Sequence, residues 1–189
     1  MHPNETVDYW RGHINGLIVD QYRDKLKGNV ADFGSGKGFM SAILAEFTSI
    51  KTVTAIDIVE PSIELPNKVK FQKGDLTKLK VPKTKFDAAV TFHTLEHIKD
   101  VGKAIEIIAK QIKVGGYLIV SVPFMGAYWN ETHVQQFNLD TLRSYFETGS
   151  VVKGKKTKLF TTVELYHDTR IDDHGNQHDC ITGLFERGQ

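Results

Sequence analysis

The chain has 189 residues, enough for one domain with a substantial core, and its composition is ordinary for a soluble globular protein. Lysine and arginine number 24 against 23 aspartate and glutamate residues, so the net charge of +1 gives no overall attraction to nucleic acid or an anionic membrane. The single cysteine, Cys180, cannot form an internal disulfide. No apolar run approaches the roughly 18 residues that span a bilayer, and the N-terminus lacks signal-peptide features. We therefore expect a cytoplasmic protein with no membrane partner.

Short β-rich segments alternate with helical ones from residue 29 to residue 123, after a helical region within residues 7–26. Strands are predicted at residues 29–33, 52–57, 69–76, 86–92 and 117–123, and helices at 39–47 and 101–112. Asp100 is the predicted N-cap of the second helix. This alternation predicts a parallel sheet with right-handed crossovers and helices on both faces.

The pattern changes after Pro123, where a loop rich in aromatic residues and histidine covers residues 124–137. This loop is the predicted substrate lid, and Phe124, Tyr128 and Trp129 would be available to stack on a ring. A short helix (138–147) and two strands (156–169 and 178–187) are predicted to follow, the strands joined by a turn-rich segment.

The whole chain, residues 1–189, is therefore predicted to form a single domain with an N-terminal helical cap over residues 1–28. Its fold class is α/β, a Rossmann-like, doubly wound, mostly parallel sheet of about seven strands that ends in an antiparallel hairpin.

The stretch ADFGSGKGF, residues 31–39, follows the first predicted strand and carries three glycines. It does not fit a P-loop, because the first glycine of that motif is replaced by alanine and Gly38 stands where a hydroxyl residue is required. It does not fit the dinucleotide motif G-x-G-x-x-G either, because Phe39 stands at the third glycine, which disfavours a nicotinamide oxidoreductase. What fits is D-x-G-x-G-x-G, in which the missing side chains let the backbone touch a ligand.

This motif resembles the first motif of class I S-adenosylmethionine-dependent methyltransferases. The resemblance continues through GDL (74–76), FDAAVTFHTLEHIKD (86–100), IAKQIKVGGYLIVSVP (108–123) and HVQQFNLDTLRSYF (133–146), so it covers most of the chain. It implies S-adenosylmethionine as the cofactor. In this family a helix before the sheet often folds over the cofactor, so Tyr9 or Arg11 would meet the cofactor's carboxylate.

The resemblance implies a cofactor site at the carboxyl edge of the sheet. Asp32 would hold the cofactor's ammonium group, Asp57 would accept from the ribose hydroxyls, and Asp75 would reach the exocyclic amine of adenine. The full set of expected cofactor-binding residues is Asp32, Gly34, Ser35, Gly36, Gly38, Asp57, Ile58, Asp75, Leu76, Phe92 and His93.

Histidines cluster after the fourth predicted strand. His93, Glu96 and His97 have the spacing that a helical turn brings together, and His133 arrives at the same sheet edge from the loop after the fifth strand. His93 and His133 are the predicted catalytic residues, since a hydroxyl acceptor must lose its proton as it attacks.

Two related groups, ubiquinone-pathway O-methyltransferases and small-RNA terminal 2′-O-methyltransferases, carry E-x-x-E-H at this place and bind a metal there. In this chain His93 replaces the first glutamate. We therefore do not expect a divalent metal, although His93, Glu96, His97 and His133 are the cluster that would hold one.

The sequence favours methyl transfer to a small-molecule acceptor, at oxygen. One alternative is a metal-dependent RNA 3′-end 2′-O-methyltransferase, for which the basic stretch 151–158 would contact phosphate, although nucleic acid is not favoured as a partner. Another is a non-catalytic protein that binds S-adenosylmethionine. The sequence leaves open whether the protein is a monomer or a homodimer, and which acceptor it uses.

Overall fold

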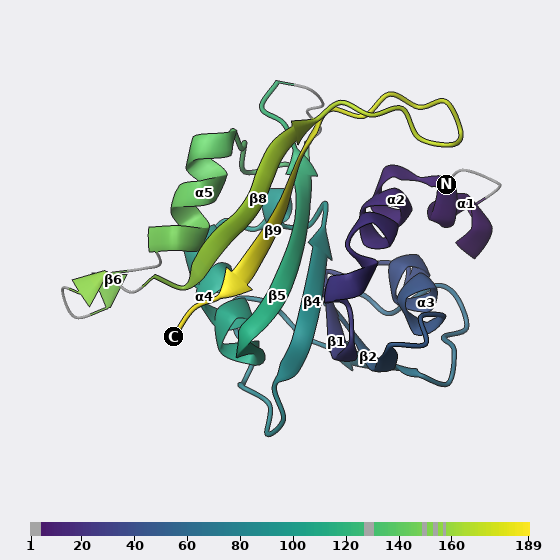
Figure 1. Cartoon of the computed structure of the whole chain (residues 1–189), viewed down its shortest axis with the longest axis horizontal. Coiled ribbons are helices and arrows are strands. Elements are labelled where there is room, and N and C mark those ends of the chain that lie inside the picture. The colour runs from purple at the N-terminus through teal and green to yellow at the C-terminus, as the bar shows by residue number, and fades with distance from the viewer. Residues whose placement is uncertain (1–4, 127–130, 149–150, 153–154, 157) are drawn as a thin grey trace.

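A seven-stranded sheet runs through the centre of the computed structural model, which describes residues 5–126, 131–148, 151–152, 155–156 and 158–189 (Figure 1). The strands are β1 (Gly28–Phe33), β2 (Ile50–Asp57), β3 (Val69–Lys73), β4 (Phe86–Phe92), β5 (Ile112–Pro123), β8 (Phe160–Asp168) and β9 (Cys180–Arg187). They lie in the order β3-β2-β1-β4-β5-β9-β8. Strands β1 to β5 are parallel, and β9 is antiparallel to both β5 and β8. The predicted Rossmann-like α/β sheet with a closing antiparallel hairpin is confirmed.

Helices cover both faces of this sheet (Figure 1). They are α1 (Val7–Gly12), α2 (Ile14–Gln21), α3 (Phe39–Ala45), α4 (Val101–Gln111) and α5 (Leu139–Thr148), with 3-10 turns η1 (Arg23–Lys25) and η2 (Leu95–His97). Ile18 of α2 and Ile43 of α3 belong to one hydrophobic core, whereas Ile105 of α4 and Phe146 of α5 belong to the other, across the sheet. None of the helices described is long and apolar enough to cross a membrane.

The N-terminal helical region is broken at His13 into α1 and α2. His13 has an extended backbone (φ −69°, ψ 156°), and its ring nitrogen Nδ1 accepts a hydrogen bond from the amide of Asn15 at the start of α2. A Cβ at Gly16 would lie 2.3 Å from the carbonyl oxygen of Arg11, so the two helices approach each other closely there. The break therefore places His13 between the two helices, where the chain changes direction.

The crossovers on the β3 side of the sheet carry no helix. Residues 58–68, between β2 and β3, and residues 74–85, between β3 and β4, run as turns and loops. Pro61, Pro66 and Pro82 interrupt these segments, and proline in a helix interior removes a backbone hydrogen bond. Loops rather than helices therefore form this end of the sheet's carboxyl edge.

Helix α4 begins as its sequence predicts. The Asp100 side chain accepts a hydrogen bond from the amide of Lys103 at 3.0 Å, which satisfies one of the free donors of the first turn. Ile105 and Ile108 are fully buried under the sheet, as their helical spacing requires. This helix joins β4 to β5, and its start at Val101 sets the end of the segment that follows β4.

Part of the predicted lid lies outside the described residues, including Tyr128 and Trp129. Phe124, at the start of the lid, stacks on His167 of β8 with ring centroids 4.0 Å apart. The two-stranded β6 (Val151–Val152) and β7 (Lys155–Lys156) form a separate small hairpin within the basic stretch. The described part of the lid therefore begins packed against the closing hairpin of the sheet.

The carboxyl ends of β1, β4 and β5 meet at one edge of the sheet, because the three strands are parallel neighbours. The chain leaves β1 toward β2 on one side and returns at β4 on the other, so this point is a topological switch. Open α/β sheets bind ligands in the crevice at such a point.

Replacing Phe146 with alanine should lower the free energy of unfolding by about 3–5 kcal/mol, because a fully buried ring would leave a cavity. Phe146 stacks on Phe185 of β9 at 4.2 Å between centroids and contacts Phe160 of β8 at 5.6 Å. Urea denaturation followed by circular dichroism would measure the loss. Phe146→Leu, which fills more of the space, should cost clearly less; equal losses would contradict this packing explanation.

Candidate active site

Three adjacent cavities open at the carboxyl edge of the sheet. The first, of about 920 Å³, is lined by Asp32, Gly34, Ser35, Trp10, Asn15 and Phe92, among others. The second, of about 650 Å³, is lined by Asp57, Ile58, Asp75, Leu76 and Thr94. The third, of about 550 Å³, is lined by Glu96, Pro123, His133, His178 and Cys180. His93 and His97 line all three, so these two side chains stand where the cavities meet.

The glycine loop between β1 and α3 depends on backbone conformations that only glycine adopts readily. Gly34 has a φ of +78°, and a Cβ there would lie 2.1 Å from Oγ1 of Thr94. Gly38 has a φ of +93° and is the N-cap of α3. A Cβ at Gly36 would meet no atom within 4 Å, so Gly36 faces open space beside the first two cavities.

Asp32, near the end of β1, is 2% exposed and lines the first cavity. Its Oδ2 accepts a hydrogen bond of 2.6 Å from the hydroxyl of Ser41 on α3. Burial raises the pKa of Asp32 to about 6, although the Ser41 hydrogen bond opposes that shift. A cationic group in the first cavity would offset the cost of burying this carboxylate.

Asp57 ends β2 and connects the glycine loop to the second cavity. Its Oδ2 accepts from the amide of Gly36 at 2.8 Å, and its Oδ1 accepts from the amide of Val59 at 2.9 Å. The carboxylate therefore holds the loop beside the strand end. Ile58, which follows it, is 65% exposed at the wall of the second cavity.

Asp75 and Leu76 lie at the other side of the second cavity. Oδ1 of Asp75 accepts from the hydroxyl and the amide of Thr77, at 2.7 and 2.8 Å, and Oδ2 lies 3.0 Å from Nζ of Lys78. These hydrogen bonds, chiefly those of Thr77, lower the pKa of Asp75 to about 2. Leu76 is buried and gives this cavity an apolar surface.

The structure brings the expected cofactor residues together, with one exception. Gly38 lines none of the three cavities; a Cβ there would lie 2.8 Å from Cδ2 of Leu65, so Gly38 is a packing and capping residue. Ser35 is 8% exposed at the first cavity, and its hydroxyl has no hydrogen-bond partner within the described structure. A ligand in that cavity would find a free donor there.

The cap contributes to the first cavity through residues that the sequence did not single out. Trp10 and Asn15 line it, and the indole Nε1 of Trp10 and Oδ1 of Asn15 are buried without partners in the described part of the chain. Tyr9 and Arg11, which we expected there, point elsewhere: Tyr9 stacks on His174, and Arg11 pairs with Glu46. Only the packing of α1 against the sheet, invisible in the sequence, decides which side of α1 faces the cavity.

His93 follows β4 and has a φ of +47°, an uncommon conformation for a residue other than glycine. Its amide donates to the carbonyl of Ser121 on β5 at 2.9 Å, its Nδ1 lies 3.6 Å from Oε1 of Glu96, and its Nε2 lies 3.9 Å from Sγ of Cys180. Burial lowers the pKa of His93, but Cys180 and the Glu96 carboxylate together raise it by more, to about 10. Non-glycine strain of this kind is often kept at functional sites.

Glu96 is 1% exposed, and neither of its carboxylate oxygens has a hydrogen bond within the described structure. His97 Nε2 lies 4.0 Å from Oε1 of Glu96, while His97 Nδ1 lies 3.1 Å from the carbonyl oxygen of Thr132. The backbone carbonyl of Glu96 accepts from the amides of Val134 and Gln135, at 2.8 and 3.1 Å. These bonds fix the segment after β5 beside the turn that carries Glu96.

His133 arrives on that segment, as its place after β5 predicts. It is 7% exposed, and its ring lies edge-on to His97 with centroids 5.0 Å apart. One potential ligand atom from each of Glu96, His97 and His133 lies within 4.8 Å of the others. Of the four residues expected to cluster, His93 stands apart from this trio, on the Cys180 side of Glu96.

Comparison with known proteins identifies related chains. Residues 10–149 match a family described as the methyltransferase domain. Two "probable S-adenosylmethionine-dependent methyltransferases", from two strains of Mycobacterium tuberculosis, are each 24% identical over 161 residues, which cover 79% of this chain. The chain spans only 56% of the length of these curated relatives.

Solved structures share the fold. The N-methyltransferase NodS from Bradyrhizobium japonicum, in complex with S-adenosyl-L-homocysteine, has a TM-score of 0.68 at 15% identity, over 99% of this chain and 90% of that one. An S-adenosylmethionine-dependent methyltransferase from Clostridium acetobutylicum has a TM-score of 0.66 at 12% identity, over 98% and 94% of the two chains.

The affinity for S-adenosylhomocysteine should fall as the pH falls through about 6, by roughly tenfold for each pH unit below that value. Asp32 of the free protein becomes protonated there, and a neutral carboxyl cannot pair with the ligand's ammonium group. Calorimetry between pH 7.5 and pH 5 would measure the slope.

The isosteric variant Asp32→Asn should bind more weakly at pH 7.5 and lose most of this pH dependence. A thermal unfolding curve would confirm that the variant is folded. The same steep slope in Asp32→Asn would assign the titration to another group.

Proposed function

The chain belongs to the methyltransferase-domain family, and we propose that it transfers the methyl group of S-adenosylmethionine to an oxygen of a small polar acceptor held in the third cavity. Bound S-adenosylmethionine supplies an electrophilic methyl group on a sulfonium, which an aligned nucleophile displaces. The chain's own part is to bind both reactants, align them and remove the acceptor's proton.

The first and second cavities suit the two ends of the cofactor. Asp32 and the unpartnered polar groups of Ser35 and Asn15 are matched to the amino-acid end. Asp57 and the apolar surface of Leu76 are matched to the ribose and the adenine. In this proposal a ribose hydroxyl would replace the Gly36 amide as a donor to Asp57, or share the carboxylate with it.

The observation that carries the proposal is that His93 and His97 line all three cavities. They mark the point where a methyl group could pass from the cofactor to the acceptor. Among the described residues, the lining of the third cavity contains histidines and acids but no phenylalanine, tyrosine or tryptophan. In this proposal the histidines and acids would hydrogen-bond a polar, hydroxylated acceptor.

The Glu96–His97–His133 trio fits a divalent metal better than the sequence suggested. The Thr132 carbonyl can only accept a hydrogen bond, so Nδ1 of His97 carries the hydrogen. If His97 is neutral, its Nε2 then presents a lone pair to the buried Glu96 carboxylate, and the two repel each other. A cation held by Glu96, His97 and His133 removes this conflict, and imidazole with carboxylate is a suitable donor set. When bound, the metal would lower the pKa of an acceptor hydroxyl.

This assignment gives His133 the role of a ligand, whereas the sequence favours His93 or His133 as a base. Both ring nitrogens of His93 face other groups, Glu96 and Cys180, which makes this residue better suited to fixing the junction than to receiving a proton. The two roles of His133, metal ligand and general base, can be distinguished by experiment, because only the ligand role requires a metal.

An RNA 3′ end is the second candidate acceptor, and the same trio favours it, because a terminal ribose presents two neighbouring hydroxyls. The shared chemistry is thus a vicinal diol, from a small polyol or from a ribose. The net charge of +1 gives an RNA strand no general attraction, so we propose the small acceptor.

Glu96→Gln should reduce turnover by on the order of 100-fold and leave the affinity for S-adenosylhomocysteine within about twofold, because Glu96 is buried in the third cavity, away from the cofactor groups. Turnover would be followed as S-adenosylhomocysteine release on hydroxylated small molecules and on short oligoribonucleotides, before and after chelation and with Mn²⁺ or Mg²⁺ restored. Glu131→Gln, an exposed site in the neighbouring segment, is the matched control.

Activity on small molecules that disappears on chelation supports the proposal in full. Activity on oligoribonucleotides alone would select the second candidate. Turnover that survives both chelation and the Glu96 substitution would reject the metal site and favour His93 or His133 as the general base. Cofactor binding without turnover on hydroxyl or amino acceptors would favour a non-catalytic binding protein.

A further inference from the structure

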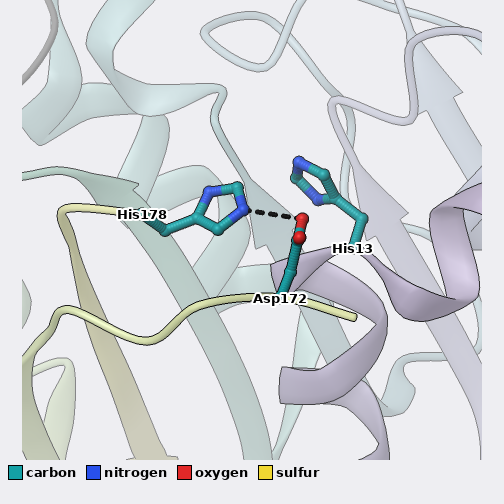
Figure 2. A group of neighbouring side chains, drawn as sticks. All are labelled: His13, Asp172 and His178. Atoms are coloured by element: carbon teal, nitrogen blue, oxygen red, sulfur yellow. Dashed lines mark hydrogen bonds and ion pairs between the residues drawn. The ribbon is translucent and has the colours of Figure 1, made fainter. Parts of the chain in front are cut away.

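A second group of side chains that could hold a metal ion lies beside the first and third cavities. His13, between α1 and α2, meets Asp172 and His178 from the loop that joins β8 to β9 (Figure 2). One potential ligand atom of each residue lies within 4.8 Å of the others. His13 and His178 both line the first and third cavities.

The Asp172 carboxylate is a buried charge, and among the described residues no lysine or arginine pairs with it. Its side chain is 0% exposed. Oδ1 accepts from the amides of His174 and Asn176, at 3.0 and 2.9 Å, and Oδ2 accepts from Nδ2 of Asn176 at 3.1 Å and lies 2.9 Å from Nε2 of His178. Amide donors and one imidazole are therefore all that this carboxylate contacts among the described groups.

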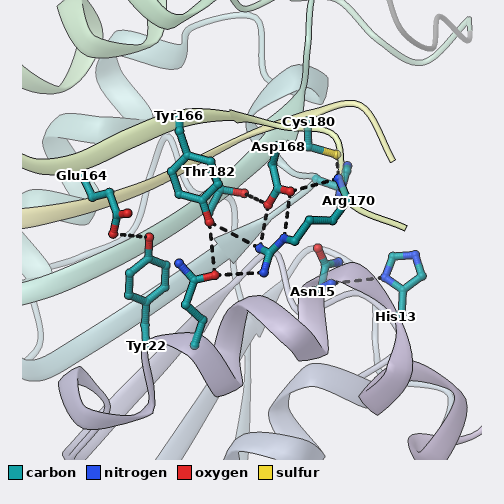
Figure 3. Close-up of polar contacts among 11 residues, drawn as sticks. His13, Asn15, Tyr22, Glu164, Tyr166, Asp168, Arg170, Cys180 and Thr182 are labelled. Atoms are coloured by element: carbon teal, nitrogen blue, oxygen red, sulfur yellow. Dashed lines mark hydrogen bonds and ion pairs between the residues drawn. The ribbon is translucent and has the colours of Figure 1, made fainter. Parts of the chain in front are cut away.

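The nearest arginine in the loop serves another acid. Arg170 donates to both carboxylate oxygens of Asp168, at 2.9 and 2.7 Å, and to the amide oxygen of Gln21, at 3.0 Å (Figure 3). Thr182 completes that arrangement by donating to Asp168 at 3.0 Å. Arg170 is therefore occupied by Asp168 and Gln21, and the partners of Asp172 among the described residues are amides and the His178 imidazole.

The backbone that carries the three residues is already held in place. The amide of Asp173 donates to the carbonyl of Gly12 at 3.0 Å, and the ring of His174 stacks on Tyr9 with centroids 4.3 Å apart. A Cβ at Gly12 would lie 2.9 Å from Nε2 of His174, so glycine permits this approach. The loop is therefore docked on the N-terminal helices by contacts that do not involve His13 or His178.

We propose that His13, Asp172 and His178 bind a divalent transition-metal ion of the Zn²⁺ type, at a site separate from Glu96, His97 and His133. Two imidazoles and a carboxylate are the donors that zinc accepts, with ligand bonds of about 2.0–2.2 Å. Tetrahedral bonds of that length put ligand atoms about 3.4 Å apart. The ligand atoms of this group lie within 4.8 Å of one another, and Oδ2 of Asp172 lies 2.9 Å from Nε2 of His178.

A hydrogen-bonded loop without metal accounts for part of this geometry. It explains the contact between His178 and Asp172, and it leaves His13 as the cap of α2, packed edge-on to His178 with ring centroids 4.8 Å apart. It does not explain why the ring of His13, without a hydrogen bond to the Asp172 carboxylate in the described structure, lies beside it. The metal gives all three residues a role. Three protein ligands would also leave a fourth position of the ion open, and two of the three, His13 and His178, line the first and third cavities.

Zinc titration of the metal-stripped whole chain by calorimetry tests the site. His178→Gln retains an amide donor for Asp172 but removes the imidazole ligand, and His13→Ala removes a ligand from the other element. His167→Ala is the matched control, because His167 lies on the same hairpin but pairs with Asp179. Both ligand variants should bind one equivalent of Zn²⁺ fewer than the control, whatever the occupancy of the Glu96 site.

Thermal unfolding separates a metal ligand from a merely structural residue. Excess Zn²⁺ should raise the melting temperature of the control more than that of His178→Gln or His13→Ala, while in chelator the variants should unfold cooperatively. A deficit that is the same with zinc and with chelator would overturn the proposal. Unchanged zinc stoichiometry in both variants would overturn it as well. These readouts do not involve methyl transfer, so they stand apart from any failure of the proposed function.

Discussion

The close approach of Gly34 to Thr94 determines the geometry of the site. The loop after β1 and the loop after β4 touch at this point, where a Cβ on Gly34 would lie 2.1 Å from the Thr94 hydroxyl. Because the two loops meet, the cofactor loop lies directly beside His93, the residue before Thr94. Any larger residue at position 34 would force the loops apart and separate the first two cavities from the third.

The sequence predicted the sheet, and it predicted which residues gather at the sheet's carboxyl edge, because both depend on local signals. Strand and helix periodicity, the Asp100 cap and the spacing of the glycines are all read within a few residues. It also placed His133 correctly, because the carboxyl ends of parallel strands share one edge. The break at His13 and the helix-free crossovers were harder to predict from the sequence. Glycine and proline weaken a helix, but they do not determine the direction in which the chain continues.

What the sequence could not supply were contacts between distant segments. Trp10 and Asn15 reach the cofactor cavity instead of Tyr9 and Arg11 only because of how α1 packs. Asp172 and His178 lie close to His13 although more than a hundred and fifty residues separate them in the sequence, and no short motif predicts this contact. That the Glu96 carboxylate lacks a hydrogen bond among the described residues is likewise a property of its burial rather than of the L-E-H stretch.

The helix-free crossovers beside β3 give the two ends of the site unequal access to solvent. Ile58 and Val59, at the wall of the second cavity, are 65% and 61% exposed, whereas Glu96, His133 and Cys180, around the third, are each 7% exposed or less. The second cavity therefore lies at the more exposed end of the site, beside the loops at the β3 end of the sheet. Around the third cavity the buried Glu96 carboxylate lies in a medium of low dielectric constant, where the field of a charged group is little screened.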